Sequence, residues 1–411
     1  MKNVYLFMLL IVMIGSGMSC EKNDKGIDLP SEPRVIELSA KAPEIISSSN
    51  DFGISLFTQT AINEDGNLML SPLSANIALT MLLNGSDGDT YEQIKGMLGY
   101  PEDLNIEDIN LIYQNLVKEF LETDSKVSLA IANAIFYKKG FSFKEVFLNK
   151  MDTDFDAHVE GLYFEEPDAV EIINQWASDN TNKRIPKVID DISNDMVMFL
   201  MNALYFKGEW THEFDKAKTN DKSFILDNGN EIQTSTMEGK IKVMLHYGKD
   251  YAAMEIPYGR KNFSMIVVIP EGTLKNFYKN FTPGLWDEIT TSLDGQGGWN
   301  EVLVNLPKFK FDYEKILNDQ LKALGMNDAF APYVANLSGI SDEELFVSFV
   351  KQNTFVEVNE EGTEAAAVTT TGIEVVSMPP HFFVNKPFIF AIRERTTNTL
   401  LFMGGVTNPK E

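Results

Sequence analysis

Apolar residues recur at every third or fourth position along several stretches of this chain, which is the spacing of a helix with one buried face. These stretches are residues 42–62, 72–83, 90–98, 101–122, 170–180 and 314–324. Two of the predicted helices carry end signals: Ser71 and Pro72 suit the start of the second, and Gly99 suits the end of the third. The pattern therefore predicts a chain rich in amphipathic helices.

Other stretches alternate between apolar and polar residues, or are apolar throughout, as strands do. They are residues 127–137, 196–206, 252–257, 263–269, 302–311, 354–358, 388–393 and 400–406. The run 196–206 is almost wholly apolar, as expected of a strand buried on both faces. The last two flank a polar turn at 395–399, which predicts a hairpin. Because helices and strands do not alternate regularly, the pattern predicts an α+β fold with largely antiparallel sheets.

The stretch 360–377 has the composition of a strand but is too long for an ordinary one, because from Gly362 to Ser377 it would span roughly 50 Å when extended. One face of such a strand carries no charge: Thr363, Ala365, Ala367, Thr369, Thr371 and Ile373. Glu364 and Glu374 lie on the other face. Two interpretations are open: a flexible loop or edge strand, or an exposed loop that later becomes a buried central strand. Predicted strands on both sides favour the second.

The composition indicates one large acidic domain. The 411 residues are 44% hydrophobic, which is ample for a large core, and no linker-like segment or repeat occurs after about residue 40. Acidic residues outnumber basic ones by 60 to 35, for a net charge of −25, without any cluster of lysine or arginine. Nucleic acid and anionic membrane surfaces are therefore not expected as partners. A basic partner would be attracted, although such acidity also serves solubility alone.

The first residues indicate export. Lys2 precedes an apolar run at 4–14, which is too short to span a membrane comfortably, and small residues then lead to Cys20. Cys20 resembles the lipidated first residue of a bacterial lipoprotein, although Gly17 stands where a larger aliphatic residue is usual. The alternative is an ordinary secretory signal followed by an incidental cysteine.

These features divide the chain into three parts. They are a signal peptide at 1–19, a flexible tether at 20–40 and a folded domain at 41–411. Lipidation at Cys20 would make the mature protein a bacterial outer-membrane or cell-surface lipoprotein, held at the membrane only through its lipid. Because Cys20 is the only cysteine, no disulfide can form within the chain.

The sequence carries no local motif of a catalytic site. Its four histidines show no metal-binding spacing, and it has neither a Gly-x-Ser-x-Gly nucleophile motif nor a phosphate-binding glycine loop. We therefore expect no enzyme activity, no metal and no cofactor. A hydrolase whose triad is spread through the sequence is the remaining enzymatic alternative. Turnover of ester or peptide substrates would reveal it.

Several motifs resemble those of one family. They are Val-Asn-Glu-Glu-Gly-Thr-Glu-Ala-Ala-Ala at 358–367, Asn-Lys-Pro-Phe at 385–388, Phe-Met-Gly-Gly-Val-Thr-Asn-Pro at 402–409 and Asn-Ala-Leu-Tyr-Phe-Lys-Gly-Glu-Trp at 202–210. Together they resemble the hinge, the C-terminal signature and a central-strand motif of the serpins. The resemblance implies a fold of large, mostly antiparallel sheets with surrounding helices and an exposed reactive-centre loop. It also implies a serine protease inhibitor that acts as a suicide substrate.

In that mechanism a protease cuts the loop, and the freed loop enters the central sheet while the acyl-enzyme is still attached. Alignment on the hinge places the cut between Val376 and Ser377. The hinge itself would comprise Glu360, Glu361, Gly362, Thr363, Glu364, Ala365, Ala366 and Ala367. Thr363 is neither proline nor charged and the alanines are small, so these side chains would hinder entry of the loop into the sheet very little. This favours an inhibitor over a non-inhibitory serpin that serves as a binding module.

The resemblance also implies a target and a stoichiometry. Val376 suits the small apolar pocket of elastase-like serine proteases, while chymotrypsin-like and papain-like cysteine proteases are alternatives. A shift of one residue would put Val375 or Ser377 at the cut. We expect a monomer that forms a covalent complex with its target. The helix predicted at 101–122 is acidic where some serpins carry a basic, heparin-binding helix, so no heparin cofactor is expected.

Further residues correspond to family positions that control opening of the sheet. They are Ser71, Ser74 and Asn202, with Gln352 standing where a histidine is usual, and Trp210 beneath the point where the loop enters. Gln352 can still donate and accept hydrogen bonds, so the cluster can form without a titrating member. Lys183 stands where a glycine is usual, so the resemblance does not predict the backbone conformation at this position.

Overall fold

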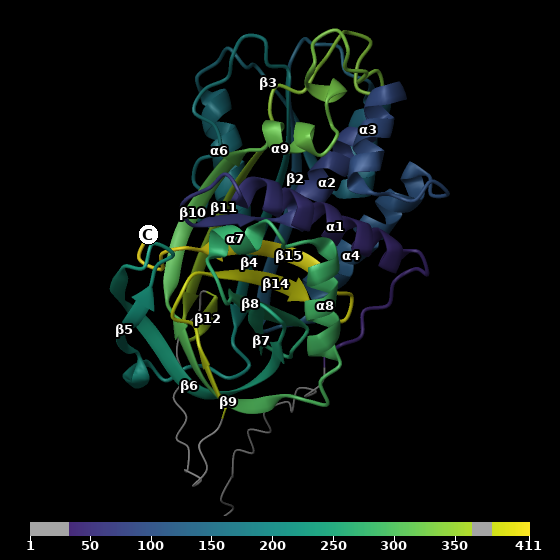
Figure 1. The fold of residues 1–411 in the computed structure, drawn as a ribbon. Helices are drawn as coiled ribbons and strands as arrows, with labels where there is room; N and C mark the ends of the chain where they lie inside the picture. The colour runs from purple at the N-terminus through teal and green to yellow at the C-terminus, as the bar shows by residue number, and fades with distance from the viewer. Residues whose placement is uncertain (1–32, 364–379) are drawn as a thin grey trace, which may run out of the picture. The chain divides into compact units, whose positions relative to one another are not determined.

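The computed structural model describes residues 33–363 and 380–411, and the elements below belong to one unit that begins at Glu32 (Figure 1). Within the described residues there are two sheets and a set of helices packed on them. The helices are α1 (Ala42–Ala61), α2 (Pro72–Leu83), α3 (Gly88–Leu98), α4 (Ile106–Thr123), α5 (Glu145–Phe155), α6 (Asp168–Asn180), α7 (Leu274–Tyr278), α8 (Pro283–Asp294) and α9 (Asn318–Ala323).

The predicted helix ends are confirmed for α2 and α3. The Ser71 hydroxyl accepts a hydrogen bond from the Ser74 N–H, and Gly99 ends α3 with a left-handed φ of +69°. The prediction of a helix over 101–122 was wrong at its start, because Asn105 caps α4 by accepting from the Asp108 N–H at 2.8 Å. The prediction over 314–324 was wrong for its first residues, which continue a strand.

The first sheet has six strands, and it contains most of the residues singled out from the sequence. Its order is β10 (Phe309–Ile316), β11 (Lys351–Asn359), β12 (Gly362–Thr363), β4 (Met198–Glu209), β2 (Val127–Lys138) and β3 (Ala157–Leu162). The strand predicted over 302–311 is in fact two strands of different sheets, β9 (Asn300–Pro307) and β10. The chain changes sheet at Lys308.

The second sheet has nine strands. Its order is β1 (Leu68–Leu70), β15 (Thr399–Val406), β14 (Phe388–Glu394), β8 (Phe263–Pro270), β7 (Tyr251–Pro257), β6 (Glu231–Tyr247), β9 and β13 (His381–Phe383), and β5 (Asn220–Ile225) pairs with β6. The predicted hairpin is confirmed as β14 and β15.

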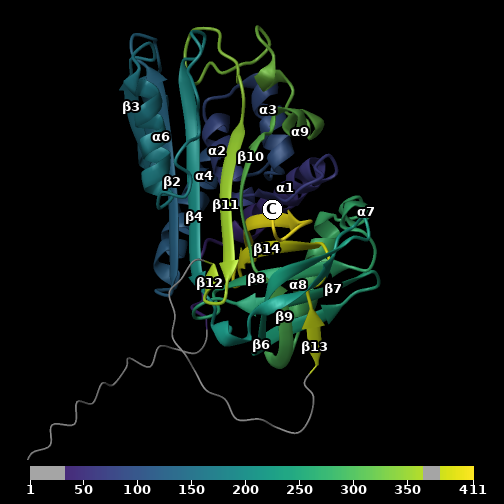
Figure 2. The ribbon, with the colours of Figure 1, turned by 90° about the vertical axis from the view of Figure 1, so that its left-hand side faces the viewer.

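The six-stranded sheet is covered on both faces. Along β2 successive side chains point to opposite faces, so that Ile135 belongs to the main core shared with α1 and α2, while Phe136 belongs to a second core beneath α6. Figure 2 shows β3, β2, β4, β11 and β10 side by side, with α6 in front of β3 and β2. Between β4 and β11, side chains of α2 and α6, among them Leu79 and Trp176, line the space from the two faces.

Candidate functional site: the centre of the six-stranded sheet

The six-stranded sheet has a two-residue strand near its centre. β12 pairs antiparallel with β11 on one side and with β4 on the other. Thr363 lies opposite Val358 of β11 and Gly208 of β4. In the described part of the chain β12 is the strand that joins these two long strands (Figure 2). The first residues of the long stretch noted in the sequence thus already belong to the sheet.

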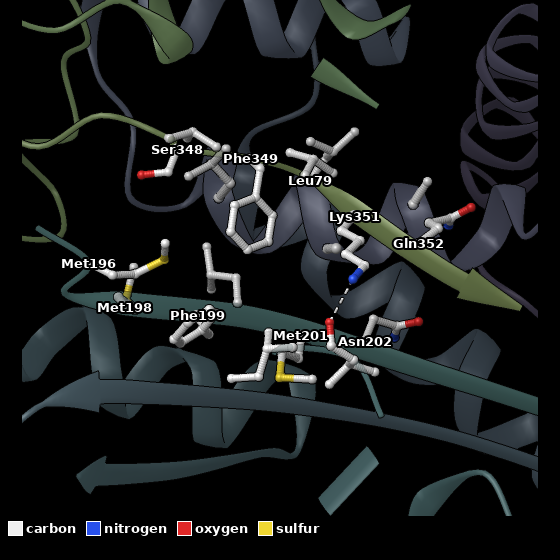
Figure 3. A pocket seen from close by; sticks show the side chains of 18 of the residues that line it. Leu79, Met196, Met198, Phe199, Met201, Asn202, Ser348, Phe349, Lys351 and Gln352 are labelled. Carbon is white, nitrogen blue, oxygen red and sulfur yellow. Dashed lines mark hydrogen bonds between the residues drawn. The ribbon is translucent and has the colours of Figure 1, made fainter. Parts of the chain in front are cut away.

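A cavity of about 380 Å³ lies farther along the facing edges of β4 and β11. Its lining is mainly apolar, with Met198 and Met201 from β4, Phe349 from the segment before β11 and Leu79 from α2 (Figure 3). Polar groups enter it from Lys351 and Gln352 of β11 and from Asn202 of β4. The space where another strand would lie is thus lined by side chains rather than filled by backbone.

Gly362 is a position that only glycine fits. Its φ is +146°, which side chains with a Cβ rarely adopt. A Cβ at this position would also collide with the carbonyl oxygen of Gly208 on β4. The predicted hinge glycine therefore allows the chain to turn from β11 and pass close to β4.

The two hinge glutamates are buried against basic and hydroxyl partners. Lys308 donates to both carboxylate oxygens of Glu360, at 3.1 and 2.9 Å, and the Thr219 hydroxyl donates to the same group at 2.7 Å. Glu361 pairs with Lys216. Both glutamate side chains are only 6% exposed. Burial alone would raise the pKa of Glu360, but the hydrogen bonds from Lys308 and Thr219 hold it below its usual value.

The stacked rings of Trp210 and Tyr258 lie next to the hinge and contact it. Their rings stack at 4.3 Å with an interplanar angle of 8°. The Trp210 indole donates to the Asn359 carbonyl at 2.9 Å, and its backbone N–H donates to the Glu361 carbonyl at 2.8 Å. The Tyr258 hydroxyl lies 2.8 Å from the Thr363 hydroxyl. Because burial raises the pKa of Tyr258 well above its usual value, this phenol stays protonated.

Three residues of the predicted sheet-opening cluster share one hydrogen-bond network. The Ser71 hydroxyl donates to the Leu401 carbonyl at 2.8 Å and accepts from the Ser74 N–H at 3.2 Å. The Gln352 amide accepts from the Ser71 N–H at 3.2 Å and donates to the Ser71 carbonyl at 2.8 Å. One neutral side chain thus satisfies a buried donor and a buried acceptor at the start of α2.

Asn202 lies on the other side of the cavity. Its amide donates to Asn133 of the neighbouring strand at 2.7 Å rather than to Ser71, Ser74 or Gln352. Its carbonyl oxygen is buried and has no hydrogen-bond partner among residues 33–363 and 380–411. The predicted cluster is therefore divided between the two edges of the cavity.

The remaining predicted site residues lie outside the described residues: Glu364, Ala365, Ala366, Ala367, Val376, Ser377 and Cys20. Sequence reasoning missed Tyr258, Lys308, Lys216 and Thr219, all of which contact the hinge from more than 50 positions away. The one available signal was the Glu360–Glu361 pair itself, because adjacent carboxylates at a buried hinge require donors.

Within the described ranges no group of three or more His, Cys, Asp or Glu side chains is arranged to hold a metal ion. None of the helices found in those ranges has the length and apolar character needed to cross a bilayer.

The described part of the chain thus has a mixed α and β architecture in which the short strand β12 pairs with two long strands of a six-stranded sheet. The chain belongs to the serpin family, because the family model described as "Serpin (serine protease inhibitor)" matches residues 47–409. The α+β serpin fold expected from the sequence is thereby confirmed.

Relatives and solved structures agree with this assignment. A serpin-like protein of Methanosarcina acetivorans is 32% identical over 89% of this chain and 88% of its own length. The leukocyte elastase inhibitor of Xenopus laevis is 34% identical over 84% of this chain and 94% of its own. The native-state crystal structure of the thermophilic serpin tengpin is similar with a TM-score of 0.81 and 30% identity, covering 92% of this chain and 97% of that one.

Proposed function

We propose that this protein inhibits serine endopeptidases as a suicide substrate, through cleavage between Val376 and Ser377 and insertion of the freed loop beside β12. The observation that carries the proposal is the pairing of β12 on both of its edges. A loop whose first residues are already in the sheet can lengthen an existing strand and needs no new nucleus.

The register of β12 supports the extension. In an antiparallel pair each residue gained along the loop moves one residue back along β4, so Ala365 would lie opposite Phe206 and Ala367 opposite Leu204. Phe206 and Leu204 are buried. The uncharged face of the loop would thus meet the core with small side chains, and Glu364 would point to the other face.

The energetics of insertion are adequate for trapping. Extending the strand to Ile373 would add ladder bonds to both β4 and β11, each worth roughly 0.5–1.5 kcal/mol net, so a gain on the order of 10 kcal/mol is reasonable. Loss of a single oxyanion-hole donor slows a serine protease roughly a hundredfold or more. The gain from insertion therefore exceeds what is needed to distort an attached protease and stop deacylation.

We further propose elastase-like enzymes as the targets. Val376 at the cut suits a small apolar specificity pocket and disfavours a pocket with an acidic base. The similarity to a protein named leukocyte elastase inhibitor supports this choice. In the same proposal Cys20 is lipidated and the inhibitor acts at a bacterial surface.

The deciding experiment mixes residues 21–411 with an elastase and separates the products on a denaturing gel. A covalent band at the summed mass, together with a released fragment that begins at Ser377, is the expected result. The matched control is Val376→Arg, which should lose the elastase complex and gain one with a trypsin-like protease. Complete cleavage without any covalent band would refute suicide inhibition, and a complex with chymotrypsin-like or papain-like enzymes alone would refute the target class.

A further inference from the structure

Residues 34–41, which directly precede α1 and are called the entry segment below, are bound along the length of α4. At one end the Lys41 ammonium donates to Asp103, just before α4, at 2.7 Å. At the other end the Arg34 guanidinium donates to Glu119, in the last turns of α4, at 2.7 Å. Because α4 has 18 residues, it is about 27 Å long. The entry segment therefore runs antiparallel to α4 over roughly that distance.

Further contacts hold the entry segment against the domain. The Asn262 side chain bonds the Arg34 backbone twice: its oxygen accepts from the Arg34 N–H at 2.8 Å, and its amide donates to the Arg34 carbonyl at 2.7 Å. Ile36 is 7% exposed and belongs to the main core. Figure 1 shows the segment, in purple, running from the start of α1 towards the lower end of the view, where β9 is drawn. The chain from Cys20 therefore joins the domain at Arg34 and not at the start of α1.

Arg34 lies at the same end of the domain as the hinge. One turn, residues 258–262 between β7 and β8, contacts both. Its first residue, Tyr258, has its hydroxyl 2.8 Å from that of Thr363, and its last residue, Asn262, binds Arg34. The tether and the proposed reactive loop thus join the domain at the two ends of a single turn.

The distance between Cys20 and Arg34 limits how an anchored domain can turn. Arg34 follows Cys20 by 14 positions, so covalent geometry lets the two lie at most roughly 50 Å apart. A compact domain of this length is roughly 55 Å across. With Cys20 in the membrane, the chain is too short to pass around the domain, and the end that carries Arg34 and the hinge must face the lipid. A compact protease of about 240 residues, roughly 45 Å across, fits into the space that remains, and a much larger one does not.

We propose that the entry segment turns the loop end of the anchored inhibitor towards the membrane, so that the inhibitor traps compact proteases close to the bacterial surface and excludes large ones. This inference rests on the proposed function, including lipidation at Cys20. The net charge of −25 repels an anionic surface and so keeps the gap open. Release of the entry segment would move the attachment point to Lys41, at the far end of α4 and up to roughly 75 Å from Cys20, and the loop end would then be free to turn outward.

The test anchors the mature chain, residues 20–411, to phosphatidylcholine vesicles through Cys20. Because Cys20 is the only cysteine, a maleimide lipid attaches the chain at this position alone, whether or not cells lipidate it. The anchored protein is mixed with free elastase or with elastase coupled to a dextran much larger than the domain. The same chain with a capped Cys20, free in solution, is the reference for each enzyme. The rate of covalent-complex formation is measured in all four cases.

Two changes should abolish the size selection. Arg34→Ala combined with Ile36→Ser releases the entry segment, and thermal unfolding verifies that this variant folds. An insertion of about 20 glycine and serine residues after Lys25 lengthens the tether and leaves the domain untouched. Val35→Ser is the matched control for the substitutions, because Val35 lies within the segment but is 73% exposed.

We expect anchoring to slow dextran-linked elastase about tenfold or more relative to free elastase in the wild type and in Val35→Ser, because the geometry prevents engagement. The released variant and the lengthened tether should lose this difference. An anchored wild type that traps both enzymes in the ratio seen in solution overturns the proposal. Size selection that persists in a folded released variant overturns the role of the entry segment, and persistence with the lengthened tether overturns the limit set by its length. If the chain in solution traps neither enzyme, the proposed function itself fails, and the size selection fails with it.

Discussion

Replacing Thr363 by arginine tests whether the loop must enter the sheet for this protein to inhibit. Thr363 is 5% exposed, pairs with both neighbouring strands, and lies with its hydroxyl 2.8 Å from that of Tyr258. Thr363→Arg would place a guanidinium at the first position of the inserted strand. Tyr258 offers it a neutral phenol and no carboxylate, so the charge would enter the core without a counter-ion.

The size of the effect follows from the cost of burying that charge. An unpaired ion in a protein interior costs several kcal/mol, so roughly 4 kcal/mol would favour an uncut state in which residue 363 leaves the sheet. Insertion would then have to bury the arginine again and would be slowed about a thousandfold. The full insertion, worth on the order of 10 kcal/mol, would still be favourable. Deacylation of the protease would nevertheless finish first. Thr363→Arg should therefore be cleaved at the same bond and release active protease.

The assay measures the fraction of elastase held in the covalent complex and the moles of inhibitor consumed per mole of enzyme. Thr363→Val is the control, because it keeps the shape and removes only the hydroxyl bond to Tyr258. We expect the valine variant to inhibit almost as well as the wild type and the arginine variant to behave as a substrate. A wild-type yield of complex from Thr363→Arg would refute the claim that Thr363 must be buried.

Three other substitutions probe the site. Glu360→Gln should remove a pH-dependent stabilisation: because the pKa of Glu360 is lowered in the fold, its contribution is full above the usual carboxyl value and is lost as the pH falls through the folded value. Unfolding of variant and wild type should then converge in acid, and a constant difference would contradict this. Gln352→Ala should cost about 2 kcal/mol in chemical denaturation, since it leaves the buried Ser71 N–H unpaired, and an unchanged midpoint would count against it. Lys183→Gly should stabilise the native state by roughly 0.5–1 kcal/mol by relieving a φ of +62°, and a lower melting temperature would exclude that strain.

Local patterns in the sequence predicted much of the fold. Ser71, Pro72 and Gly99 mark helix ends through backbone chemistry that depends only on neighbouring residues, and these predictions were confirmed. The errors occurred where pairing between residues far apart in the sequence determines which sheet a strand joins. Residues 302–311 have the pattern of one strand, yet β9 and β10 belong to different sheets because their partners, β6 and β11, lie far away in the chain.

The candidate site was predictable in part for the same reason. Gly362 and Thr363 could be singled out from the motif and from the absence of side-chain bulk. That they already belong to the sheet, however, depends on the pairing of Thr363 with Gly208 of β4, and no local sequence pattern encodes that pairing. Lys183 shows the limit most clearly: the sequence marked it as unusual for the family, and the structure adds that both Asn182 and Lys183 are left-handed.

The contacts around the sheet also fix an order of events for the proposed mechanism. At one end the hinge is already paired, and the bonds of Lys308 and Thr219 to Glu360 hold it there. Farther along, the Lys351 side chain lines the cavity between β4 and β11. Because the pairing is antiparallel, extension from Thr363 would proceed along β11 from Val358 towards Lys351 and along β4 from Gly208 towards Met198. In the proposed mechanism, pairing of the inserted strand therefore begins at the hinge and reaches the cavity last.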